Sequence, residues 1–535
     1  MRYLLLAATA AFPILAAGFA RQEADVEKLI RSLSSSDFEE QGRAAKALEQ
    51  LGRPALPALR KAAQGTSPDA KYWADKIIAR IEASGKGRGL EAVIEKLGSE
   101  DDQVKEGAES DVRKAGRAAL HLLKEALKSE NQNLRKRAER LIREIENSSE
   151  VPSAADEHFA GRIRDRARLL ARAGGDKEIE NAIMSALAWL ARHQSPDGSW
   201  GAEAFVERCG GRRCTGIGDP DHDRGVTSLA VLAFLGAGFV PPALPEGPEA
   251  SAADSVRRFG EAARKGLAWL ITRQDRLGGV GGRGAKYMYS HAMGTLALVE
   301  ATGMTGQAQY KEAANRALQF LISARNPDRV WRYFTGGGDN DTSVTGWCIE
   351  AFYAADLANL ASPPADMREA AVKWLDEVTD DRGRAGYNAR NSPKVVVPGK
   401  NDQFGSHETM TAISVLSRDF LKRLDSKNPK VVAGLALLSA DAPAWSRDKI
   451  DSYYWHWASL ALYQADGPEG AAWRAWNGAL QAALLRNQET GICVNGSWSP
   501  EEDRWGFEGG RVYATALNAL TLETACRYPP PPLRK

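Results

Sequence analysis

The stretch Ala186-Leu-Ala-Trp-Leu-Ala-Arg-His-Gln-Ser-Pro-Asp-Gly-Ser-Trp-Gly201 decides how most of this chain folds. It predicts an apolar helix that ends near Gln194, with Gly198 and Trp200 following at fixed spacing. A loop and a second apolar helix come next, beginning with Thr227-Ser-Leu-Ala-Val-Leu-Ala-Phe-Leu235. Degenerate copies of this unit continue toward the C-terminus, six in all. A repeat of this length predicts an architecture of packed helix pairs.

The six copies occupy residues 177–528, and each has an outer helix, a Gly-rich loop and an inner helix. Strand patterns are nearly absent. The expected outer helices cover 186–193, 266–273, 314–324, 369–378, 429–439 and 473–487. The expected inner helices cover 226–236, 292–302, 343–355, 409–420, 457–464 and 513–526. Twelve alternating helices predict an all-α fold, an (α/α)6 toroid whose inner helices line a central cavity.

The repeat motif carries a resemblance to known families. Gln194-x-x-x-Gly198-x-Trp200 resembles the glutamine–tryptophan repeat of squalene and other terpenoid cyclases. Gly278-Gly-Val-Gly-Gly-Arg-Gly-Ala-Lys-Tyr-Met-Tyr-Ser-His-Ala-Met-Gly-Thr-Leu296 is similar to the Gly-rich repeat of protein prenyltransferase β subunits. Both resemblances imply the same toroid. In it, Gln bonds open backbone groups at a helix end, Gly permits the chain reversal, and Trp packs between repeats.

The motifs that carry these families' activities are incomplete. A class II terpenoid cyclase protonates an alkene with the Asp-x-Asp-Asp-Thr motif, and the nearest segment is Asp339-Asn340-Asp341-Thr342. In this alignment the amide of Asn340 occupies the position of the protonating Asp. A shifted alignment places Asp339 and Asp341 at the first two acidic positions of the motif instead. The zinc-binding Asp-x-Cys of prenyltransferases is missing from 286–290, and the thioester motif Gly-Cys-Gly-Glu-Gln is absent. We find no nucleotide-binding motif and expect no cofactor and no metal.

Candidate chemistry therefore lies at the starts of the inner helices. Alignment of these starts places six residues at one position, namely Asp223, Ser290, Asp341, His407, Tyr453 and Arg511. The next position holds Arg224, His291, Thr342, Glu408, Tyr454 and Val512. We expect a polar ring at the cavity mouth, in which Asp223, Ser290 and Asp341 could equally be helix N-caps. The catalytic candidates are His291, His407 and Glu408, for acid–base work, together with Asp339 and Asp341.

Aromatic residues gather beside this ring. Such a lining suits an isoprenoid chain, a carbocation or the face of a sugar, although packing between repeats explains it equally well. The ligand-binding candidates are Arg224, Tyr289, Trp331, Tyr333, Trp347, Tyr454, Trp455, Arg511 and Tyr513.

The N-terminal part predicts a different organisation. Residues 1–20 read as a signal peptide, with a positive start, an apolar run and small residues at a cleavage site. Within 22–147, Gly52-Arg-Pro-Ala-Leu-Pro-Ala-Leu59 recurs as Gly116-Arg-Ala-Ala-Leu-His-Leu-Leu123, and short amphipathic helices surround both copies. This region resembles HEAT repeats, which form an α-solenoid that binds a protein partner or serves as a rigid spacer. Residues 148–176 form a linker, and 529–535 a Pro-rich tail.

Charge and cysteine content narrow the alternatives. A formal net charge of +2 provides no basic field for nucleic acid, and no segment after the signal peptide predicts a membrane span. Export to the periplasm or the outside of the cell permits disulfides, and Cys209-Gly-Gly-Arg-Arg-Cys214 predicts a small disulfide loop. A zinc site with His222 is the less favoured interpretation of these cysteines. Cys348, Cys493 and Cys526 are expected to be small buried hydrophobic residues.

These observations favour an exported binding or scaffold protein, with a protein partner on the solenoid and a hydrophobic or glycan ligand in the toroid. The first alternative is a terpenoid cyclase-like enzyme that uses Asp341 or Asp339 as its acid. The second is a glycan-acting lyase or glycosidase that uses His291, His407, Glu408 and Arg511, an idea that rests on analogy between toroid folds.

Overall fold

The computed structural model describes residues 165–528, apart from 212, 241–252, 283, 285, 328, 337, 361–362, 393–394, 406 and 422–427. It also describes separate stretches between 26 and 163, the longest of which are 55–64, 102–115 and 131–147. The chain divides into two compact units, Met1–Val151 and Pro152–Lys535. The expected signal peptide and the Pro-rich tail lie outside the described residues, as does most of the first half of the expected linker.

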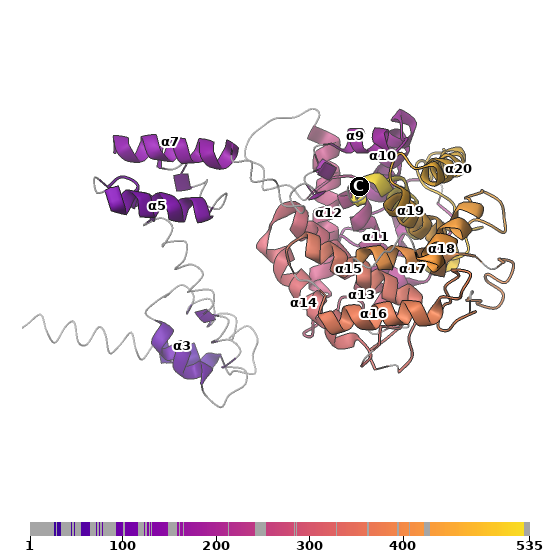
Figure 1. The fold of residues 1–535 in the computed structure, drawn as a ribbon, viewed down its shortest axis with the longest axis horizontal. Coiled ribbons are helices and arrows are strands. Elements are labelled where there is room, and N and C mark those ends of the chain that lie inside the picture. Colours follow the sequence, from indigo (N-terminus) through magenta and orange to yellow (C-terminus); the bar gives the residue numbers. More distant parts are fainter. Residues whose placement is uncertain are drawn as a thin grey trace, which may run out of the picture. The chain divides into compact units, whose positions relative to one another are not determined.

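The N-terminal unit contains α3 (Leu56–Ala63), α5 (Asp102–Ala115) and α7 (Gln132–Asn147), which Figure 1 labels. Its buried residues form two separate clusters whose members match at the spacing of the internal repeat. Leu33 corresponds to Leu97 and Leu59 to Leu123, and all four are fully buried. Equal burial at equivalent positions supports two structurally similar copies. The HEAT-like assignment itself stays a prediction.

The second unit is an all-α toroid. Its inner helices are α11 (Asp223–Gly236), α13 (Tyr287–Thr305), α15 (Thr342–Leu357), α17 (Thr409–Phe420), α19 (Ser452–Asp466) and α21 (Gly506–Leu522). Each inner helix contacts the next in chain order, and α21 contacts α11, so the ring is closed. The described residues form no strand beyond a single bridge between Thr379 and Ala385. The structure thus confirms the predicted all-α toroid.

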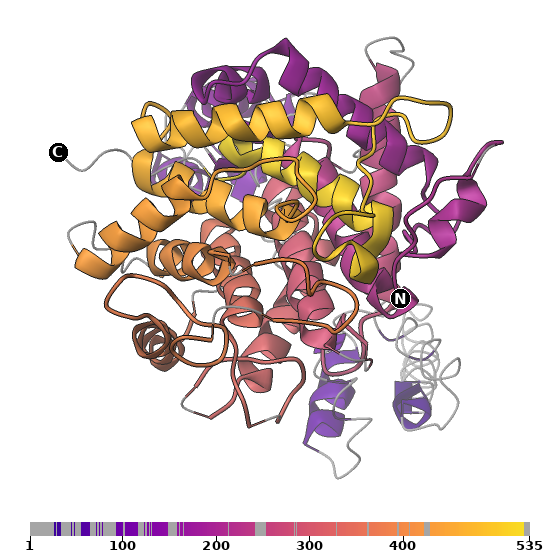
Figure 2. The ribbon, with the colours of Figure 1, turned by 90° about the vertical axis from the view of Figure 1, so that its right-hand side faces the viewer.

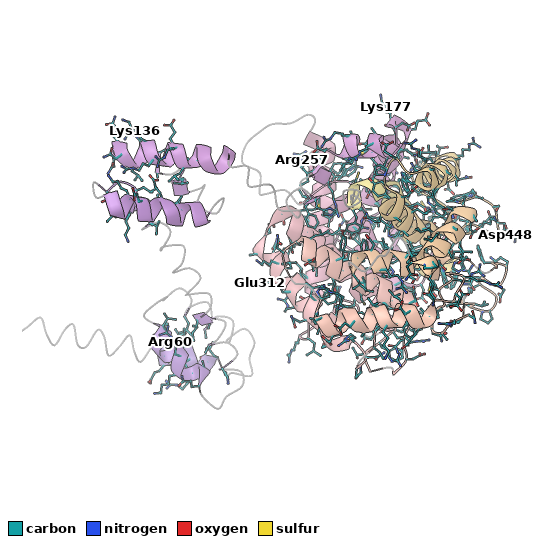
Figure 3. The ribbon with its side chains drawn as sticks, in the orientation of Figure 1. Arg60, Lys136, Lys177, Arg257, Glu312 and Asp448 are labelled. Atoms are coloured by element: carbon teal, nitrogen blue, oxygen red, sulfur yellow. The ribbon has the colours of Figure 1, made fainter. Side chains whose placement is uncertain are left out.

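The outer helices are α10 (Lys177–Arg192), α12 (Ala253–Thr272), α14 (Ala308–Ala324), α16 (Ala365–Val378), α18 (Pro429–Ala440) and α20 (Ala471–Asn487). They surround the inner ring, as Figure 2 shows from a second side. An inner helix such as α11 is buried on all sides from Gly225 to Gly236, whereas outer helices keep one polar face. Lys177 on α10, Arg257 on α12 and Glu312 on α14 lie on that exposed surface (Figure 3).

The repeat motif joins neighbouring repeats through its Gln and Trp. Gln194 Nε2 donates to the carbonyl of Gly198 in its own loop and to that of Ala262 on α12, both at 2.9 Å. Trp200 is fully buried, and its indole donates to the Leu190 carbonyl at 2.8 Å. In the sixth repeat, Gln488 Nε2 donates to the Ala182 carbonyl of α10 at 2.8 Å. The same motif therefore closes the ring between the last repeat and the first.

A buried ionic network lies toward the C-terminal ends of the inner helices. Glu300 on α13 accepts from Arg162 at 2.6 Å and from Arg527 at 2.7 Å, and Arg527 also lies 3.3 Å from Glu350 on α15. All four side chains are fully buried. Burial opposes the charge of Glu300, but the two guanidinium groups outweigh this and lower its pKa to about 2. This network fills the interior of the ring away from the cavity described below.

Among the described helices, none combines the length and the apolar character that crossing a bilayer requires.

Candidate functional site: the toroid cavity

A cavity opens where the inner helices begin. All six inner helices contribute to its wall, through residues in or near their first two turns. It contains about 960 Å³ of empty space, including its open mouth. The apolar and aromatic wall consists of Val226, Leu229, Tyr289, Met293, Tyr333, Tyr387, Val395, Met410, Tyr453, Trp505 and Tyr513. The polar lining residues are His222, Lys286, Ser290, Ser343, His407, Thr409 and Glu508.

Three of the five tyrosine hydroxyls on this wall are bonded to the protein, whereas Tyr513 Oη has no hydrogen-bond partner among the described residues. Tyr453 Oη lies 2.7 Å from Ser343 Oγ and accepts from the Trp347 indole at 2.9 Å. Tyr333 Oη bonds to Tyr387 Oη. Burial raises the pKa of Tyr453 and of Tyr387, so both phenols are neutral. With their hydroxyls engaged, these tyrosines present mainly ring surface to the cavity.

A carboxylate at the cavity wall is bound by a lysine and a histidine. Glu508 Oε1 accepts from Lys286 Nζ at 2.7 Å, and Glu508 Oε2 lies 2.5 Å from His222 Nε2. Burial opposes the charge of Glu508, but the hydrogen bonds from His222 and Lys286 outweigh it and lower the pKa to about 2. The three groups form a hydrogen-bonded cluster at the cavity wall. Sequence analysis missed Lys286 and Glu508 as site residues, because they lie 222 residues apart and no local spacing connects them.

Asp341 lies behind the cavity wall. It is the N-cap of α15, where Oδ1 accepts from the Val344 amide at 2.7 Å, as the N-cap alternative expected. Oδ2 accepts from Tyr387 Oη at 3.3 Å, and only Tyr387 of this pair lines the cavity. Burial raises the pKa of Asp341 to about 7 against the opposing effects of the Val344 amide, Arg332 and Tyr387. Its carboxyl group is thus connected to the cavity through a tyrosine hydroxyl.

The other acidic candidate, Asp339, lies on the surface. Its side chain is 57% exposed and forms an ion pair with Arg332. It does not line the cavity. The side chain of Asn340 instead bonds within the loop, where Oδ1 accepts from Asn326 at 3.0 Å and from the Val330 amide at 3.2 Å. The Asp339–Thr342 segment therefore serves to shape the loop before α15.

The structure separates the three acid–base candidates. His407 lines the cavity and bonds through Nδ1 to Thr409 Oγ1. Glu408 faces away, paired with Arg384 and accepting from Thr411 Oγ1 at 2.8 Å. His291 is fully buried outside the cavity, where Nδ1 accepts from the Val280 amide at 3.0 Å. Burial lowers the pKa of His291 to about 3, so it is a neutral structural residue.

The ligand-binding candidates also divide into two groups. Tyr289, Tyr333 and Tyr513 line the cavity. The others lie elsewhere, namely Arg224, Trp331, Trp347, Tyr454, Trp455 and Arg511. The three tryptophans of the second group are packing residues, since all are buried and the Trp331 indole donates to the Leu321 carbonyl at 2.8 Å.

Arg511 differs most from expectation. It is buried, and it donates to the Thr215 carbonyl at 2.8 Å and to Glu489 at 2.8 Å.

Asp223 and Ser290, which were also expected to be N-caps, do not cap their helices. The N-cap residue of α11 is His222, and that of α13 is Lys286. The Asp223 carboxylate instead accepts from the Ala202 amide at 2.7 Å. The predicted polar ring is therefore only partly formed.

The cysteines correct a further expectation. Cys209 and Cys214 carry free thiols, so the expected disulfide is not formed. Their sulfur atoms converge with Cys493 and His193, all four ligand atoms lying within 4.8 Å of one another. Cys348, Cys493 and Cys526 are buried as expected, and Cys493 also belongs to this cluster. Local spacing suggested a bond between two cysteines, but ring closure brings in a third from the sixth repeat.

Comparisons with known proteins find distant structural neighbours. No family model matches the sequence, and no curated protein matches it. A type II terpene cyclase from Scytonema is similar at 16% identity with a TM-score of 0.41, covering 65% of this chain and 97% of that one. An α-1,6-mannanase from Salegentibacter sp. is similar at 9% identity with a TM-score of 0.42, covering 68% of this chain and 98% of that one. Identities this low do not specify an activity.

Proposed function

We propose that the toroid binds an apolar ligand of the isoprenoid class in its central cavity and holds it without cyclising it. One observation carries this proposal: five of the six inner helices, together with the loops between helices, build a wall of aromatic rings, methionines and aliphatic side chains. Such a wall binds an extended or polycyclic hydrocarbon by burying its apolar surface, at about 25 cal/mol per Å². Aromatic ring faces add shape complementarity to rigid, flat ligands.

The polar groups at the cavity favour a lipid over a sugar. A glycan site requires several polar side chains that converge on hydroxyl groups with open hydrogen-bonding positions. Here Lys286 and His222 are bonded to Glu508, and the hydroxyl of Tyr453 is bonded to Ser343. Glu408 and Arg511, which the glycan alternative required, do not line the cavity. Of the four residues that the lyase or glycosidase alternative required, His407 alone lines the cavity.

The position of Asp341 argues against cyclisation. Direct protonation of an alkene requires a strong acid whose proton points at the carbon atom. In this toroid the hydroxyl of Tyr387 stands between the Asp341 carboxyl group and the cavity, at 3.3 Å from Oδ2. Burial raises the pKa of Tyr387, which makes this phenol a weaker acid than usual. The geometry therefore supports a binding role rather than the cyclase-like alternative.

Ligand binding can be measured with purified protein by native mass spectrometry and thermal shift. The ligands are squalene and geranylgeraniol, with a soluble mannotriose as the polar comparison. A ligand at one hundred times its Kd stabilises the folded state by about 2.7 kcal/mol, which the thermal shift resolves. We expect shifts with the isoprenoids only, and unchanged lipid on recovery.

A matched pair of variants locates the binding site. Met293→Trp fills the cavity, because Met293 lines it and is only 8% exposed. Val256→Trp adds the same side chain on the outer helix α12, where Val256 is 58% exposed. We expect Met293→Trp to abolish isoprenoid binding and Val256→Trp to retain it, both with wild-type helical content. Equal binding by the two variants, or recovery of a cyclised product, would contradict the proposal.

The proposal extends to the whole chain as an exported protein whose N-terminal repeats hold a protein partner. Its support is the signal-like segment 1–20 and the internal repeat in 22–147. Mass spectrometry of the mature N-terminus tests export. Crosslinking of the full chain in its native compartment tests the partner, with a chain lacking 22–147 as the control.

A further inference from the structure

Four potential metal ligands meet at one place in the toroid, apart from the cavity. His193 follows directly after α10, and Cys209 follows the short helix η3 (Ala204–Arg208). Cys214 lies five residues further along the same loop, and Cys493 comes from the loop between α20 and α21. Their ligand atoms lie within 4.8 Å of one another, and none of the four residues lines the cavity. Three thiols and one imidazole match the ligand set of a structural zinc site.

The distances fit a tetrahedral ion. Zn–S bonds of about 2.3 Å and Zn–N bonds of about 2.1 Å place nitrogen and sulfur about 3.6 Å apart in a regular tetrahedron. His193 Nε2 lies 3.3 Å from Cys493 Sγ, 3.7 Å from Cys209 Sγ and 3.7 Å from Cys214 Sγ. One imidazole nitrogen is thus surrounded by three sulfurs at nearly the spacing that a shared ion imposes.

The surrounding groups orient the ligands. His193 Nδ1 lies 2.9 Å from the Trp189 carbonyl, which can only accept, so Nδ1 carries the proton and the lone pair of Nε2 faces the thiols. The Trp189 ring stacks on the imidazole at 4.2 Å between centroids and holds its plane. The Cys214 amide donates to Cys209 Sγ at 3.3 Å, a bond that stabilises a thiolate.

Positively charged side chains lie near the four ligands, as a negatively charged zinc–thiolate complex requires. Zn²⁺ with three thiolates and one neutral imidazole carries a net charge of about −1, which nearby cations stabilise. Arg192 lies close enough to Cys214 and Cys493 to interact with both electrostatically. The Arg511 guanidinium holds the same loop through Thr215. Soft thiolate ligands in a tetrahedral arrangement select zinc over magnesium or calcium.

The site lies at the seam where the toroid closes. His193, Cys209 and Cys214 belong to the first repeat and Cys493 to the sixth. Hydrogen bonds cross the same seam, from Arg192 to the Asn495 carbonyl at 2.8 Å and from Gln488 to the Ala182 carbonyl at 2.8 Å. An ion bound here would connect two loops that are 300 residues apart in the chain.

We propose that His193, Cys209, Cys214 and Cys493 bind one Zn²⁺ ion that clasps the first repeat to the sixth. Binding forms three Zn–S bonds and one Zn–N bond and releases the three thiol protons to solvent, without any change of oxidation state. Four protein ligands complete the tetrahedron and leave no position for water or substrate, so the ion is structural. This proposal replaces two expectations from the sequence, namely that the protein binds no metal and that Cys209 and Cys214 form a disulfide. The inference is independent of the proposed lipid binding.

Metal content is the first test. The full chain is purified under reducing conditions without chelators, and zinc, iron and copper are measured by inductively coupled plasma mass spectrometry. We expect about one zinc per chain in the wild type and in Cys348→Ser, whose buried thiol lies outside the cluster. We expect Cys493→Ser to lose at least about ten-fold in zinc affinity, since it removes one of four ligands. Equal zinc affinity of Cys493→Ser and the wild type, measured by competition with a chelator, overturns the proposal.

Spectroscopy and stability separate a clasp from adventitious binding. Replacement of zinc by Co²⁺ should give the intense visible bands of a tetrahedral ion and the near-ultraviolet absorption of thiolate-to-metal charge transfer. Removal of the metal should lower the Tm of the wild type by at least about 5 °C and leave that of Cys493→Ser unchanged. Octahedral Co²⁺ bands, an unchanged Tm on metal removal, or a Cys209–Cys214 disulfide in the purified protein would each overturn the proposal.

Discussion

Replacement of Arg527 by Met tests the ionic network inside the ring. Arg527 is the partner that Glu300 and Glu350 share, at 2.7 Å and 3.3 Å, and all three side chains are fully buried. Removing one partner of a buried ion pair costs about 3–5 kcal/mol, because the remaining charge stays uncompensated. Arg162 remains on Glu300 at 2.6 Å, which limits the loss. We therefore expect Arg527→Met to lower the free energy of unfolding by about 3 kcal/mol at pH 7.

The loss should depend on pH, with a definite sign. Burial raises the pKa of Glu350 to about 7, and Arg527 acts against this rise. A folded-state pKa above the unfolded value means that stability falls as pH rises from about 4.5 to about 7 and is level above that. Without Arg527 the pKa of Glu350 rises further, so the variant continues to lose stability above pH 7. The deficit relative to the wild type should therefore grow between pH 7 and pH 8.5.

Urea unfolding followed by tryptophan fluorescence at pH 6, 7 and 8.5 measures this deficit. Lys177→Met is the control, because Lys177 is exposed on α10 and surface changes of this kind alter stability by less than about 0.5 kcal/mol. A deficit below about 1 kcal/mol, or one that shrinks as pH rises, would refute the reasoning. Either result would mean that water reaches these carboxylates and screens them.

Three further predictions concern the cavity wall and the repeat motif. Asp341→Asn keeps an N-cap residue but removes a carboxyl group whose pKa is raised by burial. The wild type should therefore lose stability relative to this variant as pH rises from about 4 to about 7. Urea titrations at several pH values measure the difference. Gly198→Ala should lower the free energy of unfolding by about 2–4 kcal/mol, because φ at Gly198 is 98° and an added Cβ would lie 2.4 Å from the Lys265 carbonyl oxygen. Gly478→Ala should raise it by about 0.5–1 kcal/mol, because Gly478 lies within α20 with open space around it. Thermal unfolding compares the two variants. Glu508→Gln removes a carboxylate whose pKa is lowered to about 2. The wild type should lose the stability that this carboxylate contributes as pH falls from about 4.5 to about 2, and the variant should not show this loss. Acid unfolding monitored by circular dichroism measures the difference.

The helices and their order could be predicted from sequence because their signals are local. An apolar run at helical spacing, ended by a Gln–Gly–Trp loop, specifies a helix pair wherever it occurs. Six such pairs predicted the closed ring that the contacts between α21 and α11 complete. The N-cap role of Asp341 was open to the same local reasoning, since Asp before an apolar helix favours that position.

The direction in which each side chain points could not be predicted in this way. Successive residues of a helix differ by about 100° around its axis, so neighbours in sequence face different surroundings. Ser290 lines the cavity, whereas His291 packs against Phe320 of α14. His407 faces the same cavity while Glu408 pairs with Arg384. Aligned helix starts therefore identified the correct segments, but only three of the twelve aligned residues line the cavity, namely Ser290, His407 and Tyr453.

The sequence by itself determined that the opening stretch, from Ala186 to Gly201, belongs to one of six helix pairs in a ring. Tertiary structure alone decided what lies beside it. His193, within that stretch, meets Cys493 across 300 residues of chain, and Glu508 meets His222 across 286. Both encounters depend on closure of the ring between the first and sixth repeats. The spacing of residues in the sequence does not predict these contacts. The packing of twelve helices sets the distance between such residues, and the length of chain between them does not.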